Sequence, residues 1–598
     1  MGAWRFWWAA TRRFCRNWGS YVALIFGTNL VISYLAIPIF SWALELLLKW
    51  QGISYVSYTN AAAILVHHPL AVVGMVALLF AVIVLIYWQF AFLLLGVRNI
   101  FHGRPQTIRQ VLKQTVQSLH DTSLRTFIFF VGYFIVILPF GSMIFTTPLL
   151  NKAKIPAFIV SFLLDKPWLT VLLAAFYLIV GYLGIRLINL LPLMILDHHH
   201  WRKAVKISWQ QTRHHVLRDL WFILVILLMT GLTVSLSYGV IYVAQLAWDQ
   251  TGVAIAAATV NLFLMEILSE VVICYTTAVF MMLIFAYYQQ DFSIVNQRPA
   301  HYNEGRQLRR WTRVSVTLGM VLVSGLLVIF NLIYLNGLAI SSPLIISHRG
   351  VDDENGVQNT IPALVKTAKE RPDYVEMDVQ VTKDHQFVVF HDTSLKTLAG
   401  RPQKPYQLTL KQLQKLTVRE NGYQAKIPSF DDYLAAAKRS HQKLLVEIKT
   451  SGGYTRADTQ RFLDRYGDQL LKQHAQIQSL SYQVMRDIRR HDDRQFVSYI
   501  MPYNLTFPHT NANGYTMEVT TLNEQFVDRA DRLNKAVYAW DIDDTDQMDR
   551  MMFMGVTAVI TDNLHEMQNE ARTNTDQPSY AKLLLTFMNE LSLTGSDT

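Results

Sequence analysis

The chain has 598 residues, of which 52% are hydrophobic and 16% charged, a balance that excludes a single ordinary soluble domain. The net charge of +10 is unevenly placed: residues 341–598 carry 30 Lys and Arg against 34 Asp and Glu, which leaves 24 basic and 10 acidic residues before them. The basic surplus therefore lies in the apolar first part. There it indicates charge beside a membrane rather than a surface that binds nucleic acid.

Seven apolar stretches in the first 340 residues are long enough to cross a hydrocarbon core, which takes about 20 helical residues. We expect them at residues 21–48, 70–96, 126–148, 169–197, 219–247, 254–288 and 314–338. The segment before them, Met1–Trp18, is aromatic and basic, which favours an interfacial helix over a cleaved signal core. The fold expected of residues 1–340 is thus a multi-pass α-helical transmembrane bundle.

The loops between these stretches predict the orientation of the chain. Every second loop is basic, as Arg12, Arg98, Arg202 and Arg310 illustrate, and the loops between them are poor in Lys and Arg. The positive-inside tendency then places the N-terminus in the cytoplasm. Seven crossings put residues 341–598 on the extracytoplasmic side.

Polar groups within or beside the spans raise the question of a second site. Intramembrane charges such as Arg186, Glu266 and Glu270 suggest function by default, but pairing inside the bundle explains them more simply. The run Asp197–Trp201, "DHHHW", is interpreted as a polar turn beside the membrane. Three adjacent histidines on a helix would point in different directions and could not share a metal ion.

Short β-type runs alternate with amphipathic helical stretches from residue 341 onward. The nine runs are 344–347, 374–380, 387–390, 444–449, 476–480, 496–501, 515–519, 536–541 and 558–562. Repeated strand–helix units predict an α/β fold with a parallel sheet. A length of about 250 residues suits a (β/α)8 TIM barrel, with one run left over as an inserted or hairpin strand. We therefore predict a barrel domain over residues 341–598.

Chemically active side chains stand at the ends of several runs. They are His348, Arg349, Glu376, Asp378, His391, Glu447 and Lys449. Each alone is weak, because a Glu-x-Asp pair on a strand is usually solvated or salt-bridged and His-Asp after a strand is often only a turn. The ordered set at strand ends favours one site, since three buried carboxylates suit a divalent cation and the cationic groups suit an anionic substrate.

These motifs resemble the glycerophosphodiester phosphodiesterase family, whose pattern runs His-Arg-Gly, Glu-Asn-Thr, Glu-x-Asp, His-Asp and Glu-x-Lys. They stand here at 348–350, 359–360, 376–378, 391–392 and 447–449. The likeness covers about residues 345–570, and the first part resembles the multi-pass membrane domain fused to some bacterial members.

The resemblance implies a membrane-anchored enzyme that hydrolyses a glycerophosphodiester to glycerol 3-phosphate and an alcohol. His348 and His391 would be the acid/base pair, in an order that the sequence leaves open. Oxygen ligands Glu376, Asp378 and Glu447 suit one divalent cation, Ca²⁺ or Mg²⁺. The residues expected to bind phosphate or substrate are Arg349, Lys449, Asn359 and Trp540, although Trp540 is equally suited to the barrel core.

Partners and location follow from the same resemblance. A bacterial cell membrane would hold the chain, and the substrate would be a glycerophosphodiester or a lipid- or teichoic-acid-derived molecule. Three alternatives stay open: a phospholipase-type phosphodiesterase acting on lipid headgroups or lipoteichoic acid, non-catalytic binding of such polymers, and a transport or lipid-handling role for the membrane part.

The chain departs from the family at Gln358, where a glutamate usually precedes Asn-Thr. An acidic group is therefore missing beside the predicted site. The acidic residues just upstream, Asp352, Asp353 and Glu354, are candidates for supplying it.

Overall fold

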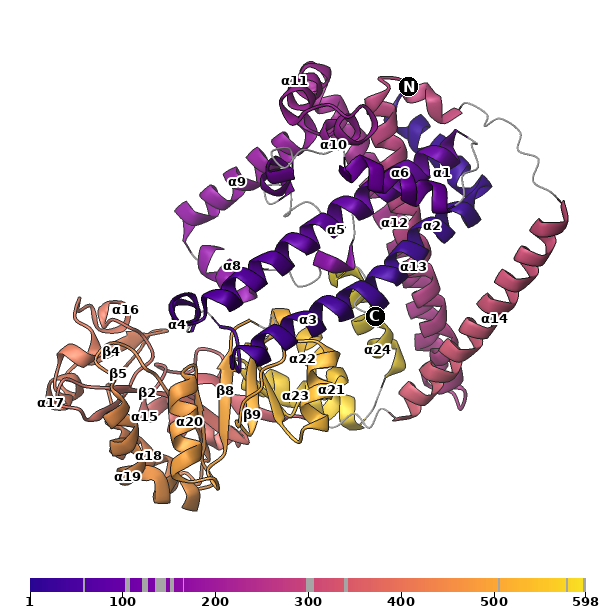
Figure 1. Ribbon diagram of the computed structural model, residues 1–598. Helices are drawn as coiled ribbons and strands as arrows, with labels where there is room; N and C mark the ends of the chain where they lie inside the picture. Colours follow the sequence, from indigo (N-terminus) through magenta and orange to yellow (C-terminus); the bar gives the residue numbers. More distant parts are fainter. Residues whose placement is uncertain are drawn as a thin grey trace.

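The computed structural model describes residues 1–57, 60–102, 108–120, 127–134, 147–150, 155–164, 166–296, 306–337, 342–503, 506–576 and 579–594. The first part is a bundle of helices, and the second is a barrel of strands surrounded by helices. Figure 1 shows the barrel at one end of the bundle, while helices α1 (Ala3–Arg16), α6 (Ile108–His120) and α11 (Trp201–Thr212) lie at the other end.

Five helical segments among these residues are long and apolar enough to cross a membrane: Trp18–Trp50, Pro69–Phe101, Pro167–Leu196, Val216–Asp249 and Ala254–Tyr288. They comprise α2 (Trp18–Val31) and α3 (Ile37–Trp50) with the π-helical turn Ile32–Ala36 between them, α5 (Pro69–Phe101), α9 (Pro167–Arg186), α10 (Leu190–Leu196), α12 (Val216–Asp249) and α13 (Ala254–Tyr288). Five of the seven predicted spans are thus confirmed.

The other two predicted spans have different outcomes. Most of residues 126–148 lies outside the described residues. Within this stretch, residues 127–134 are described and form a helix. The span at 314–338 falls within α14 (Arg306–Gly337), whose shorter apolar stretch is Val321–Leu335. The stretch found apolar among the described residues is shorter than a full crossing, so this span stays a prediction.

Two of the three charged groups predicted within the bundle, Arg186 and Glu266, have partners there, while Glu270 Oε2 is buried with no hydrogen-bond donor among the described atoms. The Arg186 guanidinium donates from Nη2 to the carbonyl of Trp209 at 2.8 Å and lies 4.2 Å from the indole ring. Asn331 donates to Glu266 at 3.0 Å. The run Asp197–His200 forms a turn between α10 and α11, and Asp197 accepts a hydrogen bond from the Tyr288 hydroxyl. These contacts agree with a structural interpretation of both features.

Eight parallel strands form the barrel within the described residues. They are β1 (Leu344–Ser347), β2 (Tyr374–Val381), β6 (Leu444–Ile448), β7 (Gln476–Ser479), β8 (Val497–Met501), β9 (Gly514–Glu518), β10 (Ala536–Trp540) and β11 (Ala558–Thr561). The order β1-β11-β10-β9-β8-β7-β6-β2 closes through the pairing of β1 with β2. The ninth predicted run is β3 (Phe387–Val389), which pairs antiparallel with β2 as a hairpin strand.

An insertion follows β3 that the predicted runs did not include. It holds α16 (Lys396–Ala399), α17 (Leu410–Gln414) and a separate hairpin of β4 (Thr417–Glu420) and β5 (Tyr423–Lys426). These strands are polar and half of their residues are exposed, so they lack the apolar pattern that identified the other nine. Their turn, Asn421–Gly422, has φ of 51° and 77°, which glycine and asparagine tolerate best.

Helices surround the strands and bury their outer faces. They are α15 (Ile361–Thr367), α18 (Phe430–Arg439), α19 (Arg456–Lys472), α20 (Tyr482–His491), α21 (Glu524–Arg532), α22 (Thr545–Met554) and α23 (Leu564–Asp576). Because side chains alternate along a strand, Val375 and Met377 face these helices while Glu376 and Asp378 face the interior. Ile346, Leu445 and Tyr538 form an apolar cluster inside the barrel.

The connection between β8 and β9, residues 502–513, contains no helix in its described part. The segment that follows α3 packs on this side instead. Its Tyr55 ring lies 4.6 Å from Tyr482 and 5.2 Å from Tyr499, and Ser54 accepts from the His509 backbone N–H at 2.8 Å. A residue of the membrane half therefore completes the packing of the barrel.

The last helix, α24 (Tyr580–Thr594), returns to the bundle and contacts α12 and α13. At its start, Asp249 accepts hydrogen bonds from the Ser579 hydroxyl at 2.8 Å and the Ala581 N–H at 2.9 Å. Arg529 adds an ion pair with Glu45 at 2.6 Å. The two polar contacts, at Asp249 and Glu45, lie at or near the C-terminal ends of α12 and α3, whereas α24 itself packs along α12 and α13.

Candidate active site

The predicted chemical groups gather where the parallel strands end. His348, Arg349 and Gly350 form a short turn directly after β1, Lys449 directly follows β6, and His391 follows the hairpin strand β3. Asp378 on β2 is the register partner of Glu447 on β6. In a closed parallel barrel these positions share one rim, which is where such barrels carry their chemistry.

Three carboxylates form an acidic triad inside the rim, which we define as Glu376, Asp378 and Glu447. One oxygen of each lies within 4.8 Å of the other two, and the residues are only 2%, 1% and 8% exposed. Such a set of hard oxygen ligands can hold a metal ion, and it suits Ca²⁺ or Mg²⁺ better than softer cations. The residues present therefore fit a divalent cation.

The pKa values of the triad show how strongly its charges conflict. Burial, together with the neighbouring Asp378, raises the pKa of Glu376 to about 8. Burial also opposes ionisation of Asp378, but the charges of Lys449 and Arg349 and the hydrogen bond from Asn359 outweigh it and lower the pKa of that carboxyl. One carboxyl thus stays ionised while its neighbour takes up a proton near neutral pH, a conflict that a bound cation would relieve.

Lys449 lies against the triad. Its Nζ is 3.0 Å from Asp378 Oδ1 and 2.9 Å from Glu447 Oε1. These carboxylates outweigh the effect of burial and raise the pKa of Lys449, so the ammonium group stays charged. One positive charge is therefore fixed beside the three carboxyl groups.

The two histidines have different partners, and these define different proton states. His391 Nε2 lies 2.9 Å from Arg349 Nη2, which can only donate, so Nε2 accepts and the ring proton is on Nδ1. His391 Nδ1 lies 3.0 Å from Asp392 Oδ1 and donates a hydrogen bond to it. His391 is thereby held as a neutral imidazole.

His348 lies between two other carboxylates. Its Nδ1 is 3.0 Å from Asp562 Oδ1 and 3.8 Å from Asp541 Oδ1. Burial and Arg349 lower the pKa of His348, but the two aspartates prevail and raise it to about 9. His348 is therefore a cation at neutral pH, in contrast to His391.

Arg349 is held by a chain of hydrogen bonds that the sequence did not predict. Its Nη1 donates to Gln358 Oε1 at 2.8 Å. Gln358 in turn donates from Nε2 and from its backbone N–H to Glu420, at 2.6 and 2.9 Å. Glu420 is the last residue of β4, so the inserted hairpin supplies a carboxylate behind the position where the family usually has one.

The upstream acidic residues do not take this role, contrary to expectation. Asp352 is buried and accepts from the His565 backbone N–H at 3.3 Å, and it interacts with Glu370. The backbone N–H of Asp353 donates to the carbonyl of Asp562. Among the described contacts, the acidic partner of Gln358 is Glu420.

Two other predicted residues lie close to the site in different ways. Asn359 is 2% exposed and uses its whole amide on Asp378: Nδ2 donates to Asp378 Oδ2 at 2.7 Å and Oδ1 accepts from the Asp378 N–H at 3.0 Å. Trp540 ends β10, half-buried, and packs against the apolar cluster inside the barrel. Asn359 thus orients a triad carboxylate, and Trp540 borders both the core and the rim.

Sequence reasoning gave no role to Asp541, Asp562 or Glu420. Asp541 directly follows β10 and Asp562 directly follows β11, so the rule that located the other groups at strand ends would have found them. Glu420 lies in the insertion, far from any barrel strand in sequence, and had no such signal.

A barrel with acidic and cationic side chains at its carboxyl end, joined to apolar helices that can span a membrane, defines a membrane-bound TIM-barrel enzyme acting on an anionic substrate. The family model for the membrane domain of glycerophosphoryl diester phosphodiesterase matches residues 7–331, and that for the glycerophosphoryl diester phosphodiesterase family matches residues 348–566. The chain belongs to the glycerophosphodiester phosphodiesterase family and is a membrane-associated phosphoric diester hydrolase.

Individual relatives match the barrel. Glycerophosphodiester phosphodiesterase GDPD4 of Arabidopsis thaliana is 28% identical over 235 residues, covering 37% of this chain and 70% of that protein. A glycerophosphodiester phosphodiesterase of Caldanaerobacter subterraneus is 23% identical over 238 residues, covering 38% and 98%. The crystal structure of a glycerophosphodiester phosphodiesterase from Parabacteroides distasonis is similar at 23% identity and a TM-score of 0.35, covering 39% of this chain and 98% of that one.

The turn that carries His348 and Arg349 depends on Gly350. Its φ is +68°, and a Cβ there would lie 2.9 Å from the Tyr433 hydroxyl and 3.3 Å from Val375. Gly400 has nearly the same φ, +65°, but a Cβ at that residue would meet no described atom within 4 Å, so it isolates the cost of the backbone conformation.

We expect Gly400→Ala to lower the free energy of unfolding by about 1 kcal/mol and Gly350→Ala by about 2–4 kcal/mol, because overpacking adds to the same conformational cost. Denaturant unfolding of the full-length protein in detergent measures both. Equal losses in the two variants would contradict the crowding at Gly350. Tyr433→Phe combined with Gly350→Ala should recover part of the difference.

Proposed function

We propose that the barrel hydrolyses a glycerophosphodiester to glycerol 3-phosphate and an alcohol, using the acidic triad to hold one Ca²⁺ or Mg²⁺ ion. The observation that carries this proposal is the convergence of three buried carboxylates, two histidines in opposite proton states, and two cations at one rim. A bound divalent cation would neutralise charge on the phosphodiester and align it for displacement.

The proton states suggest an order for the two histidines. His391, neutral with its lone pair at Nε2, suits the base that takes a proton from a substrate hydroxyl, such as the glycerol 2-hydroxyl, which would replace Arg349 Nη2 as the partner of that nitrogen. His348, cationic beside Asp562, suits the acid that protonates the departing alkoxide. The hydroxyl oxygen would bond to phosphorus as the bond between phosphorus and the oxygen of the leaving alcohol breaks. Water would then open the resulting cyclic phosphate.

Other residues would bind and orient the substrate. Arg349 offers a planar pair of donors to the phosphate and Lys449 a point charge. We assign Trp540 to the glycerol moiety, which its half-buried position at the rim permits. Asn359 was predicted to bind phosphate; because its amide is engaged by Asp378, we propose that it acts through that ligand.

We also propose that the protein lies in a bacterial cell membrane with residues 341–598 as the catalytic domain on the extracytoplasmic side. The support is geometric: the barrel contacts the ends of α3 and α12, while the basic segments near α1, α6 and α11 lie at the opposite end of the bundle (Figure 1). A tethered barrel favours substrates at the bilayer surface, such as lipid headgroups or glycerophosphate polymers including lipoteichoic acid.

The proposed reaction predicts metal-dependent release of glycerol 3-phosphate from glycerophosphocholine or glycerophosphoglycerol. With detergent-purified protein, Ca²⁺ or Mg²⁺ should support release and EDTA should abolish it. His348→Ala and Glu376→Ala should each lower kcat/KM by about 10³-fold, and Asp493→Asn, an exposed carboxylate, should change little.

Three results would redirect this assignment. Full release in EDTA would contradict the cation, and unchanged rates in the variants would contradict these residues. Folded protein that binds but never cleaves, with either metal, would favour a binding role toward polymeric or lipid-borne substrates.

The roles of the histidines predict a pH effect. An acid must be protonated, so activity should fall as pH rises through the pKa of His348, which Asp541 and Asp562 raise to about 9. Asp562→Asn removes a raising charge and should move the alkaline limb of kcat/KM downward by about 1 pH unit. Profiles of wild type, Asp562→Asn and Asp493→Asn measure this, and a limb that does not move would rule out His348 as the acid.

The contacts of Arg349 predict that Gln358 and Glu420 work as a pair. Gln358→Glu alone would place two carboxylates together, and Glu420→Gln alone would replace one of the two oxygens that accept from Gln358 by an amide NH2 group, which can only donate. Each should lower kcat/KM by about tenfold, mainly through KM, since about 1.4 kcal/mol of Arg349 positioning is lost. The double exchange restores one carboxylate and one amide, so it should recover most activity; additive losses would contradict the pairing.

A further inference from the structure

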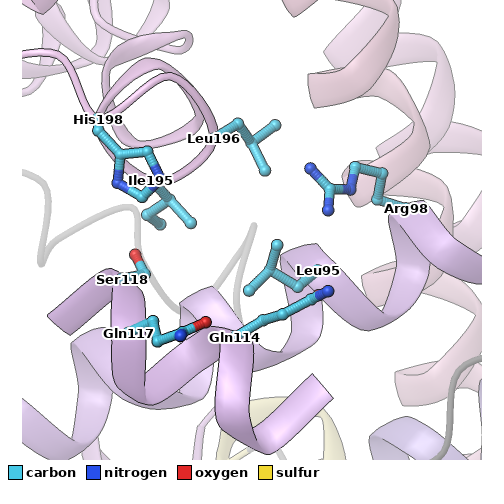
Figure 2. A pocket seen from close by; sticks show the side chains of 8 residues that line it. All are labelled: Leu95, Arg98, Gln114, Gln117, Ser118, Ile195, Leu196 and His198. Atoms are coloured by element: carbon cyan, nitrogen blue, oxygen red, sulfur yellow. The ribbon is translucent and has the colours of Figure 1, made fainter. Parts of the chain in front are cut away.

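A cavity of about 600 Å³ lies in the membrane half, apart from the barrel rim. Three segments line it: the last turns of α5, the helix α6, and the end of α10 with the turn that follows. Figure 2 shows side chains from all three surrounding the same space. A second cavity of about 250 Å³ adjoins it and shares Arg98 and Leu196.

The polar lining of the larger cavity consists of Arg98, Gln114, Gln117, Ser118 and His198. No carboxylate lines either cavity among the described residues, and the smaller one adds His102. Asp197 accepts at 2.6 Å from the hydroxyl of Tyr288, which lines the smaller cavity, so one carboxylate lies beside the cavities. The larger cavity is thus lined by one arginine and several hydrogen-bonding groups, a set that suits a phosphate ester.

One lining group calls for a ligand with a hydroxyl or amine. Gln114 Oε1 is a buried acceptor with no hydrogen-bond donor among the described atoms. Leaving such an oxygen unsatisfied costs free energy, which a ligand hydroxyl would offset. A phosphate joined to a polyol would therefore use both Arg98 and Gln114.

The position of α6 puts the cavity at the level of lipid headgroups. Ile108, Leu112 and Val116 are spaced four residues apart and are 71%, 36% and 57% exposed, so they form one apolar stripe facing outward. An amphipathic helix with such a stripe lies in the membrane interface. Its other face supplies Gln114, Gln117 and Ser118 to the cavity.

Apolar side chains complete the lining. Leu95, Ile195 and Leu196 border the same space, so the cavity offers both a polar and an apolar wall. A lipid whose phosphate meets Arg98 would place its glycerol backbone against these side chains.

We propose that this cavity binds the glycerophosphate headgroup of an anionic phospholipid at the basic, barrel-distal end of the bundle. The site is independent of the barrel chemistry, because none of its lining residues belongs to residues 341–598. It also gives a role to His198, in the polar turn that the sequence singled out.

Lipid retention by the full-length protein tests this proposal. Protein from nanodiscs of phosphatidylcholine, with or without phosphatidylglycerol, is examined by native mass spectrometry for bound lipid. Wild type should retain phosphatidylglycerol in preference to phosphatidylcholine, and Arg98→Gln should weaken that preference by about tenfold or more. Arg109→Gln removes an exposed charge on α6 outside the lining and should keep it.

A second variant and a competition with a soluble ligand complete the test. Gln114→Ala, checked for an unchanged melting profile, should weaken retention even if Arg98→Gln proves unstable. Soluble glycerol 3-phosphate should compete only weakly, because it lacks the apolar part. No preference in wild type, equal losses in Arg98→Gln and Arg109→Gln, or tight binding of glycerol 3-phosphate without lipid retention would each overturn the assignment.

Discussion

The burial of three carboxylates against one another is the constraint on which the rest of the site depends. Asp378 and Glu447 are adjacent because the parallel register pairs them, and Glu376 follows from the two-residue period of the strand. Their mutual repulsion in a desolvated place is costly unless cations surround them. Lys449 supplies one such charge. The negative charge that remains on the triad is what a bound divalent cation would neutralise.

That charge balance extends outward through Arg349 to the insertion. The guanidinium lies 4.0 Å from Asp378 through Nε while its two terminal nitrogens meet Gln358 and His391. One arginine thus ties the triad, the histidine on the hairpin side and the β4–β5 hairpin together. Because Gln358 is neutral, the negative charge on this side comes from Glu420, which is the next link in the hydrogen-bond chain that runs outward from Arg349 through Gln358. A change in the insertion can therefore alter a residue at the rim without touching the triad.

Sequence patterns predicted the elements that obey a simple period. All nine strand runs were found because each is apolar or alternates, and the seven rim residues were found because parallel strands end at one rim. The hairpin β4–β5 was missed because it is polar, although Asn421–Gly422 is a recognised hairpin turn. Glu420 and the cavity at Arg98 could not be predicted, since both depend on tertiary contacts between segments far apart in sequence.

The change in composition near residue 340 separates two textures of sequence, but the packing does not stop there. Tyr55 of the membrane half fills the side of the barrel where the connection from β8 to β9 has no described helix, and α24 of the second half returns to α12 and α13. Contacts made in both directions fix the barrel at several points rather than by a single linker. A barrel held in this way keeps a set orientation to the bundle, so the direction from which substrate reaches the rim is determined by the membrane half.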